Sequence, residues 1–376
     1  MKIRKIVSLL LSALLLSASV AAAPLPESKY RLITSPRTIP AAVFDEPYVV
    51  DEWLTRYAPW MDNFHIRGTW EVENGAYGGE ANQQQRVLAM SPVDSNVMYF
   101  ASDCAGFYRS TDGGQHWINV NEYNPSREAY WLLADKFDRE TVYSGVRRIG
   151  FCRSRDLGKT WEVIVGDTYN QNSRRSGMLA QDDAGNTYIG LGSGIYRLDR
   201  KTDEVTNLFS DFAQTNPDFK LITELKGDSG VVWFDLDVSP DGQSIYGIAT
   251  KGTADVVKGI YVSHDGGKTW KIINTTKADG NEFSFTCKSI ALYPENPNLI
   301  YTSLQLKNKE SGEKLRDYCL YKTDNLFETI SPLSGVQFSE DETGVTTKAV
   351  AQLKLTFGPK NKDGIYPIYF TGDMTA

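Results

Sequence analysis

Aspartates recur at one position of a ten-residue stretch that occurs three times in the chain. The stretch reads YRSTDGGQHW from Tyr108, CRSRDLGKTW from Cys152 and YVSHDGGKTW from Tyr261. A carboxylate held in this way could act as a general acid or base. The alternative is a self-capped turn, in which the carboxylate accepts backbone N–H groups, the glycine two residues later adopts a positive φ and the tryptophan is buried in an apolar slot. Because aspartate is common in such turns, we expect a structural set, which comprises Ser110, Asp112, Gly114, Trp117, Ser154, Asp156, Gly158, Trp161, Ser263, Asp265, Gly267 and Trp270.

The histidines and cysteines support no other familiar chemistry. His116 and His264 lie inside the repeated stretch and His65 is isolated, so no Ser-His-Asp or Cys-His set is available. The cysteines follow no metal-ligand spacing, and the sequence has no glycine-rich phosphate loop. We therefore expect no metal and no cofactor. Cys287 and Cys319 would lie on the first and third strands of one unit, about two 4.8 Å strand spacings apart, so we do not predict a disulfide between them.

The N-terminus predicts export. Residues 1–22 contain three cations, then an apolar run and small residues, which is typical of a secretory signal peptide cleaved near Ala21 or Ala22. Without those cations the chain has 37 basic against 47 acidic residues, a formal charge of about −10. This balance disfavours nucleic acid and anionic membranes as partners, and no later segment is apolar for long enough to insert in a membrane. The 20 Tyr and 8 Trp residues suit sites that bind flat apolar faces, such as those of sugars.

The repeated stretch divides residues 82–376 into units, preceded by a lead-in at residues 23–81. Each unit reads as strand, turn, strand, loop, strand, hairpin and strand, which predicts a four-stranded antiparallel sheet. A third unit keeps this frame without the repeated stretch, and a worn copy, YKTDNLFETI, stands at residues 321–330 of the fifth unit. The extra length of the fourth and fifth units is expected in their second-to-third strand loops. Repeats of this size predict an all-β fold of radial blades, a β-propeller.

The sixth unit begins near Ala349 and stops after its second strand, so about five and a half blades are visible. A propeller closes its ring to remove free strand edges. We therefore expect either that the sequence is a piece of a longer protein with six or seven blades, or that the lead-in supplies the missing strands.

The pattern S-x-D-x-G-x-[TH]-W resembles the Asp-box, or BNR, repeat of sialidase-type, sortilin-type and xyloglucanase-type β-propellers. These families share the repeat but not the chemistry, so this resemblance implies the fold. A second resemblance is more specific, because Tyr99–Arg109 is similar to the Tyr-x-x-Thr-Asp-x-Gly-Gly-x-Tyr-Arg corner of xyloglucanase-type (family 74) glycoside hydrolases. It implies a catalytic carboxylate at Asp103. Residues 369–374 stand in the same register and would place a second carboxylate, or simply another turn, at Asp373.

Strand direction decides which loops could form a site. In a four-stranded meander the first turn and the last hairpin lie at one end of the sheet, whereas the second-to-third loop and the crossing to the next sheet lie at the other. A site is therefore expected at the end opposite the Asp-boxes, near the central axis. Side chains at the starts of the innermost strands could stack on sugars or donate to hydroxyls, although alternate positions there belong to the core. The candidates are Arg86, Tyr130, Trp131, Trp233, Phe234 and Lys288.

These observations favour a secreted carbohydrate-active propeller whose ligand is a polysaccharide or oligosaccharide. If the chain is an enzyme, two carboxylates roughly 6.5–9.5 Å apart would hydrolyse a β-glucan such as xyloglucan, one protonating the glycosidic oxygen and one activating water. The alternative is a non-catalytic propeller that binds a glycan or a protein partner, of the sortilin or assembly-factor type. An exo-sialidase is a weaker alternative, because the arginines do not follow the pattern of that family; they include Arg147, Arg148, Arg174 and Arg175.

Overall fold

A computed structural model gives the fold. It describes residues 25–32, 85–102, 107–120, 129–146, 149–166, 178–191, 194–210, 232–251, 258–278, 280–313, 319–333 and 350–374. The predicted signal peptide, and the lead-in apart from residues 25–32, lie outside these ranges.

In these ranges the assigned elements are strands, which form six antiparallel sheets. The strands of each sheet are consecutive in the chain, except that β1 (Arg31–Leu32) joins the second sheet as a fifth strand beside β9. The first sheet comprises β2 (Gln85–Met90), β3 (Met98–Ser102), β4 (Phe107–Ser110) and β5 (Ile118–Asn119). The second comprises β6 (Ala129–Ala134), β7 (Val142–Val146), β8 (Gly150–Ser154) and β9 (Glu162–Gly166). The third comprises β10 (Leu179–Gln181), β11 (Thr187–Leu191), β12 (Gly194–Leu198) and β13 (Val205–Asn207). The fourth comprises β14 (Val232–Val238), β15 (Ile245–Lys251), β16 (Gly259–Ser263) and β17 (Lys271–Ile273).

The fifth sheet is larger, and the sixth is a hairpin. The fifth comprises β18 (Thr275–Ala278), β19 (Asn281–Tyr293), β20 (Asn296–Asn308), β21 (Cys319–Thr323) and β22 (Ser331–Pro332). The sixth comprises β23 (Val350–Phe357) and β24 (Ile368–Met374). Much of the extra length of the fifth unit therefore lies in two lengthened strands, β19 and β20, in addition to the predicted loop.

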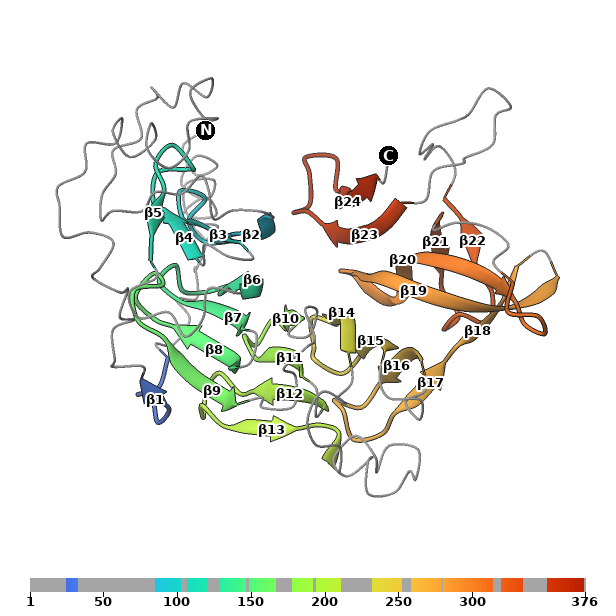
Figure 1. Ribbon diagram of the computed structural model, residues 1–376, viewed down its shortest axis with the longest axis horizontal. Coiled ribbons are helices and arrows are strands. Elements are labelled where there is room, and N and C mark those ends of the chain that lie inside the picture. Colours follow the sequence, from blue (N-terminus) through green and yellow to red (C-terminus); the bar gives the residue numbers. More distant parts are fainter. Residues whose placement is uncertain are drawn as a thin grey trace, which may run out of the picture.

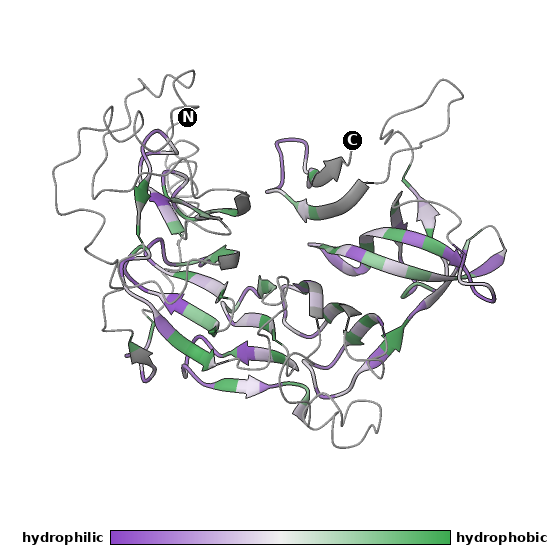
Figure 2. Cartoon of the chain, viewed as in Figure 1, coloured by the Kyte–Doolittle hydropathy of each residue, from purple (hydrophilic) through white to green (hydrophobic). Residues whose placement is uncertain are grey.

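The sheets are arranged radially, as blades (Figure 1). The strands nearest the centre are β2, β6, β10, β14, β19 and β23, and the outer strands include β9, β13 and β17. Five clusters of buried side chains fill the five junctions between successive sheets. Figure 2 shows hydrophobic residues along the strands and hydrophilic residues in the turns. The fold is thus an all-β propeller with five full sheets and a two-stranded sixth, as the repeat predicts.

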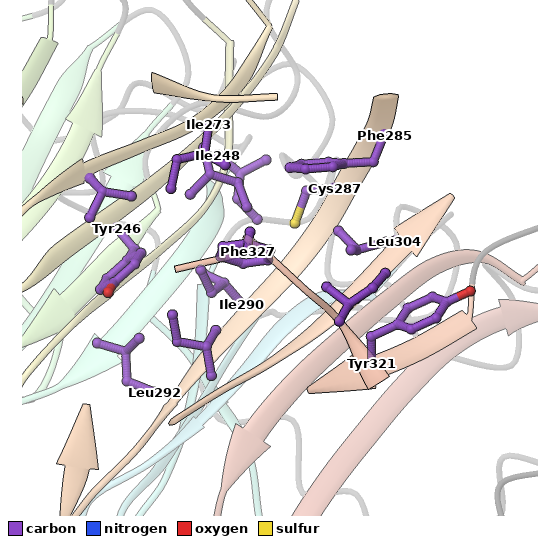
Figure 3. Close-up of a cluster of buried hydrophobic side chains, with 14 of the residues drawn as sticks. Tyr246, Ile248, Ile273, Phe285, Cys287, Ile290, Leu292, Leu304, Tyr321 and Phe327 are labelled. Atoms are coloured by element: carbon purple, nitrogen blue, oxygen red, sulfur yellow. The ribbon is translucent and has the colours of Figure 1, made fainter. Parts of the chain in front are cut away.

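The junction between the fourth and fifth sheets shows that the worn repeat still builds core. Phe327 and Ile330 come from the hairpin at residues 321–330 and are buried together with Tyr246 of β15. Figure 3 shows Phe327 in the middle of this cluster, and its ring centroid lies 5.9 Å from that of Phe285.

Each Asp-box hairpin is tied to the first turn of its own sheet. In the three sheets with an intact box, a hairpin amide donates to a carbonyl of that turn at 2.8–3.0 Å: Gly113 to Asn96, Leu157 to Glu140 and Gly266 to Gln243. In the third sheet the amide of Arg200 donates to the side chain of Asn186 at 3.1 Å. Hairpins and first turns therefore share one end of the molecule, and the second-to-third loops lie at the other, as strand direction predicts.

The box tryptophans pack against the preceding sheet. Trp161 is 1 % exposed and stacks on Phe107 of the first sheet, and Trp270 is 9 % exposed and lies against Phe209 of the third. Both are buried, as expected. Trp117 is only half-buried, because in the described part of the chain no sheet precedes the first.

Two cysteines of the fifth sheet are kept apart by a strand. Cys287 on β19 and Cys319 on β21 both lie opposite Leu304 of β20. The Cys287 thiol is free and buried.

Candidate functional site

The inner strands carry a β-bulge at one level. In β2, β6, β14 and β19 the pairing with the next strand skips one residue, and the skipped residues are Arg86, Tyr130, Phe234 and Lys288. The bulges lie at the same level in the four sheets. In each sheet the residue after the bulge pairs with a residue of the second strand, and that residue pairs in turn with a third-strand residue. This third-strand residue stands three positions before the hairpin's serine or threonine, which is Ser110, Ser154, Ser263 or Thr323. Bulges redirect side chains and are frequent beside binding sites. Four of the six predicted ligand-binding residues thus occupy equivalent backbone positions, which we call the bulge residues.

The side chains at this level are described only in part. Those of Arg86, Tyr130 and Phe234 lie outside the described residues, so the backbone alone places them. Lys288 is half-buried. Trp131, which follows the bulge of β6, is also half-buried and packs against the cluster between the third and fourth sheets.

Trp233 is a core residue. It is completely buried, and its indole N–H donates to the carbonyl of Leu191 at 2.7 Å. Gly190 and Gly247 flank the ring, and a Cβ on either would stand within 2.7–2.8 Å of ring atoms. The ring therefore fills a slot that only glycine leaves open. The predicted stacking role does not fit this position, because no face of the ring is exposed.

A carboxylate and a hydroxyl directly after two of the bulges join the inner strands. Asp235 is buried, and its Oδ2 accepts the hydroxyl of Ser289 at 2.8 Å and the amide of Ile290 at 3.1 Å. The Ser289 Oγ in turn accepts the amide of Leu355 on β23 at 2.8 Å. Side chains thus connect β14 to β19 and β19 to β23. Sequence reasoning missed these residues, although polar residues at alternate positions of VWFDLDV were an available signal.

Asp237 repeats this contact two residues further along β14. Its carboxylate accepts the amides of Leu292 at 2.8 Å and Val238 at 2.9 Å. Burial raises the pKa of Asp237 to about 7, although those two amides oppose the shift. The residue lies at the Asp-box end of β14, away from the predicted site, so its contacts give it a role in joining strands.

The two predicted catalytic aspartates are at the margin of the described structure. Asp103 lies outside the described residues, directly after β3, and Asp373 belongs to β24 but its side chain is not described. Met98 and Ile368 each pair with the last residue of the inner strand. The two aspartates therefore stand at the same interval from the first turns of their sheets. The four arginines weighed for an exo-sialidase also lie outside the described residues.

The Asp-box carboxylates are occupied within their own hairpins. In the box at 261–270, Asp265 Oδ1 accepts the Ser263 hydroxyl at 2.8 Å and the Thr269 amide at 2.9 Å, and Oδ2 accepts the Thr269 hydroxyl at 2.6 Å. The box at 152–161 has the same contacts. In the first box His116 replaces the threonine, and its amide and ring hold the pKa of Asp112 below its usual range.

Two absences can be stated for the ranges that the structure describes. In those ranges no group of three or more His, Cys, Asp or Glu side chains is placed to hold a metal ion. Nor is any helix there long and apolar enough to cross a membrane.

Comparison with known proteins supports the repeat. The profile of the BNR/Asp-box repeat family matches residues 261–271. An oligoxyloglucan-reducing end-specific xyloglucanase of Emericella nidulans is 24% identical over 220 residues, which cover 50% of this chain and 27% of the relative. A xyloglucanase of Acetivibrio thermocellus is 26% identical over 259 residues, which cover 59% of this chain and 30% of the relative. The crystal structure of the GH74 xyloglucanase from Xanthomonas campestris matches with 16% identity and a TM-score of 0.49, covering 78% of this chain and 44% of that one.

The matched segment thus spans less than a third of the length of these curated relatives. Over half of its own length or more, the chain is similar in sequence to xyloglucanases, and it carries the BNR/Asp-box repeat.

Proposed function

We propose that this chain is a secreted carbohydrate-active β-propeller that hydrolyses a β-glucan such as xyloglucan. The observation that carries the proposal is the sequence similarity to two xyloglucanases over 50% and 59% of the chain. The predicted signal peptide agrees with a substrate that is an extracellular polymer. Because the match spans less than a third of each relative, the activity requires its own test on this chain.

Hydrolysis in this proposal uses Asp103 as the general acid and Asp373 as the residue that activates water. Asp103 follows the first residue of β3 by the same number of residues as Asp373 follows the first residue of β24. These are the second strands of the first and the last sheet along the chain. Figure 1 shows these two sheets at the two ends of the row of blades, with the centre between them. A glycan at the centre would be within reach of both strand ends. Inversion would require the carboxylates to stand roughly 6.5–9.5 Å apart, with water between.

Ligand binding is assigned to the bulge residues. Two of them, Arg86 and Lys288, can donate hydrogen bonds to sugar hydroxyls, and two, Tyr130 and Phe234, can stack on the apolar faces of sugar rings. Their equivalent backbone positions on four inner strands support one shared platform around the axis. Trp131 extends this platform on β6.

The test is hydrolysis and binding of xyloglucan by the chain from residue 23 onward. Release of reducing ends and retention on a xyloglucan affinity gel are measured for wild type, Asp103→Asn and Asp265→Asn. Asp103→Asn keeps the shape of the side chain and removes its charge, so hydrolysis should fall by several orders of magnitude while binding survives. Asp265→Asn is the matched control, because it alters a carboxylate of the opposite end and should leave the activity per folded molecule unchanged.

Four results would point elsewhere. Binding of xyloglucan without cleavage by wild type would favour the non-catalytic propeller. Full activity of Asp103→Asn would remove this residue from the mechanism. The absence of both binding and cleavage would overturn the carbohydrate assignment. Release of sialic acid from sialyllactose would favour the exo-sialidase.

A further inference from the structure

Residues 25–32, which we call the strap, lie along the outer edge of the second sheet. Their last two residues form β1 (Arg31–Leu32), which pairs antiparallel with the first two residues of β9 (Figure 1). Exposure alternates before β1, since Glu27 and Lys29 are exposed whereas Ser28 and Tyr30 are half-buried. This alternation is that of an extended segment with one face on a surface.

Under the strap lies a buried cluster of charges. Arg153, Asp203 and Glu162 are 0 %, 1 % and 5 % exposed. The Arg153 guanidinium donates to both oxygens of Asp203, at 2.6 and 3.1 Å, and to Glu162 at 3.0 Å. Arg155 lies 3.4 Å from Glu162 and donates to the carbonyl of Pro26 in the strap. Two guanidinium groups thus balance two carboxylates, and these come from the second and third sheets.

The strap supplies neutral groups to this cluster. The Ser28 hydroxyl donates to Glu162 and accepts the amide of Tyr30 at 3.2 Å. The Tyr30 hydroxyl donates to the backbone carbonyl of Asp203 at 2.6 Å, and its ring lies 5.7 Å from the Arg153 guanidinium carbon. Burial and the nearby Asp203 carboxylate raise the pKa of Tyr30 to about 12, so the hydroxyl remains a donor at physiological pH.

We propose that the outer edge of β9, with the Asp203 turn of the third sheet, is a docking site for an extended segment that carries serine two residues before tyrosine, and that the strap of the same chain occupies it. Strand addition provides main-chain hydrogen bonds, and side-chain contacts provide selectivity. A buried ion cluster is favourable only when its remaining hydrogen-bonding groups are satisfied. Because the charges of the cluster already balance, the face of the occupant that contacts the cluster must be neutral and rich in hydroxyl groups. The inward face of the strap meets both requirements through Ser28 and Tyr30.

The test asks whether the strap stays bound once it is no longer covalently attached. A protease recognition sequence is inserted after residue 33 of the chain, and the folded protein is then cut. Retention of the strap fragment is followed by size exclusion with intact-mass detection. Displacement is measured with a synthetic peptide of residues 24–33. The variants are Ser28→Ala/Tyr30→Phe, which removes both hydroxyls, and the control Glu27→Ala/Lys29→Ala, which alters only the exposed side.

The strap fragment should be retained after cutting and displaced by excess peptide. Loss of two hydrogen bonds should weaken retention by roughly ten- to thirtyfold in Ser28→Ala/Tyr30→Phe, with little change in the control. Immediate loss of the wild-type fragment, or equal behaviour of the two variants, would overturn the proposal. A dimer of uncut copies, in which the strap of each copy lies on the other, would show that a second copy is the occupant and would overturn occupation within one chain.

Discussion

The intact Asp-box at residues 261–270 and the worn copy at 321–330 form the same turn from different residues. In the intact box the Ser263 hydroxyl accepts the amide of Gly267 at 2.9 Å, and Asp265 accepts the amide of Thr269 at 2.9 Å. In the worn copy Thr323 accepts the amide of Phe327 at 3.2 Å, and Asn325 accepts the amide of Thr329 at 3.0 Å. The direction of one further hydrogen bond differs. Asn325 Nδ2 donates to the Thr329 hydroxyl at 2.7 Å, whereas Asp265 accepts a hydrogen bond from the Thr269 hydroxyl.

The difference teaches which features the turn requires. It needs an oxygen acceptor at the fifth residue of the box and a hydroxyl two residues earlier, and it does not need a carboxylate. It also tolerates side chains at the two left-handed positions, since Leu326 and Phe327 have φ of 56° and 64°. The fully buried Phe327 compensates by filling the junction between two sheets. Asparagine can therefore make the contact with the amide of the ninth residue that aspartate makes in the intact box.

The largest effect is expected where the tryptophan of an intact box is removed. Trp161→Ala should lower the free energy of unfolding by about 3–5 kcal/mol, because the indole is buried, stacks on Phe107 at 4.7 Å and donates to Gly158 at 3.0 Å. Ile330→Ala, at the corresponding position of the worn copy, should cost less because the side chain is smaller. Denaturant unfolding measures both. Equal losses would mean that the worn copy depends on its last residue as much as the intact box does.

Exchanging the acceptors should exchange the acid sensitivity of the two turns. Burial tends to raise the pKa of Asp265, but the Thr269 and Ser263 contacts outweigh it and lower the pKa to about 2. A lowered folded-state pKa means that this stabilisation is complete above about pH 4 and is lost as the pH falls toward 2. Asp265→Asn should remove that acid dependence and cost about 1 kcal/mol at neutral pH, whereas Asn325→Asp should introduce it into the fifth sheet.

Unfolding curves collected between pH 2 and pH 6 for both variants test this exchange. An unchanged acid dependence in Asp265→Asn would show that the box carboxylate is not the group responsible.

A smaller effect is expected at the first left-handed position. Leu326→Gly and Leu157→Gly both restore the residue that Gly266 provides in the intact box. Relief of a left-handed conformation gains about 1–2 kcal/mol, and it is opposed by lost packing and by the greater freedom of glycine in the unfolded chain. Each variant should therefore change stability by less than about 1 kcal/mol. A loss several times larger at Leu326 would mean that packing, rather than backbone strain, governs this position.

The smallest effect is expected at the imidazole of the first box. His116 is largely exposed, and its Nδ1 lies 2.5 Å from Asp112 Oδ2. His116→Thr gives this box the hydroxyl of the other two, and an exposed ion pair contributes little, so stability should change by less than about 0.5 kcal/mol. The difference should vanish in about 1 M salt, where charges are screened within about 3 Å. A salt-independent difference would assign it to shape rather than charge.

The repeat was readable from the sequence because its contacts are local. The hydrogen bonds that Ser263, Asp265 and Trp270 make within the turn join residues two to four apart, so the pattern of residue types carries the geometry of the turn itself. The strand direction around it then follows, since antiparallel strands joined by short hairpins leave one arrangement of turns and loops. Tyr108, Cys152 and Tyr196 stand 44 residues apart each time, and this interval indicates a third blade even where the box is absent.

The sequence alone therefore determined the blades, their hairpins and the end of the molecule at which a site is expected. Tertiary structure decided the contacts between blades, which join residues far apart in the chain. Asp235 meets Ser289 and Arg153 meets Asp203 only because their sheets are neighbours, and no local pattern specifies that partner. Trp233 shows the same limit. Its place at the start of an inner strand predicts an exposed ring that stacks on sugars. Only the glycines of two adjacent strands, packed against its ring, make it core.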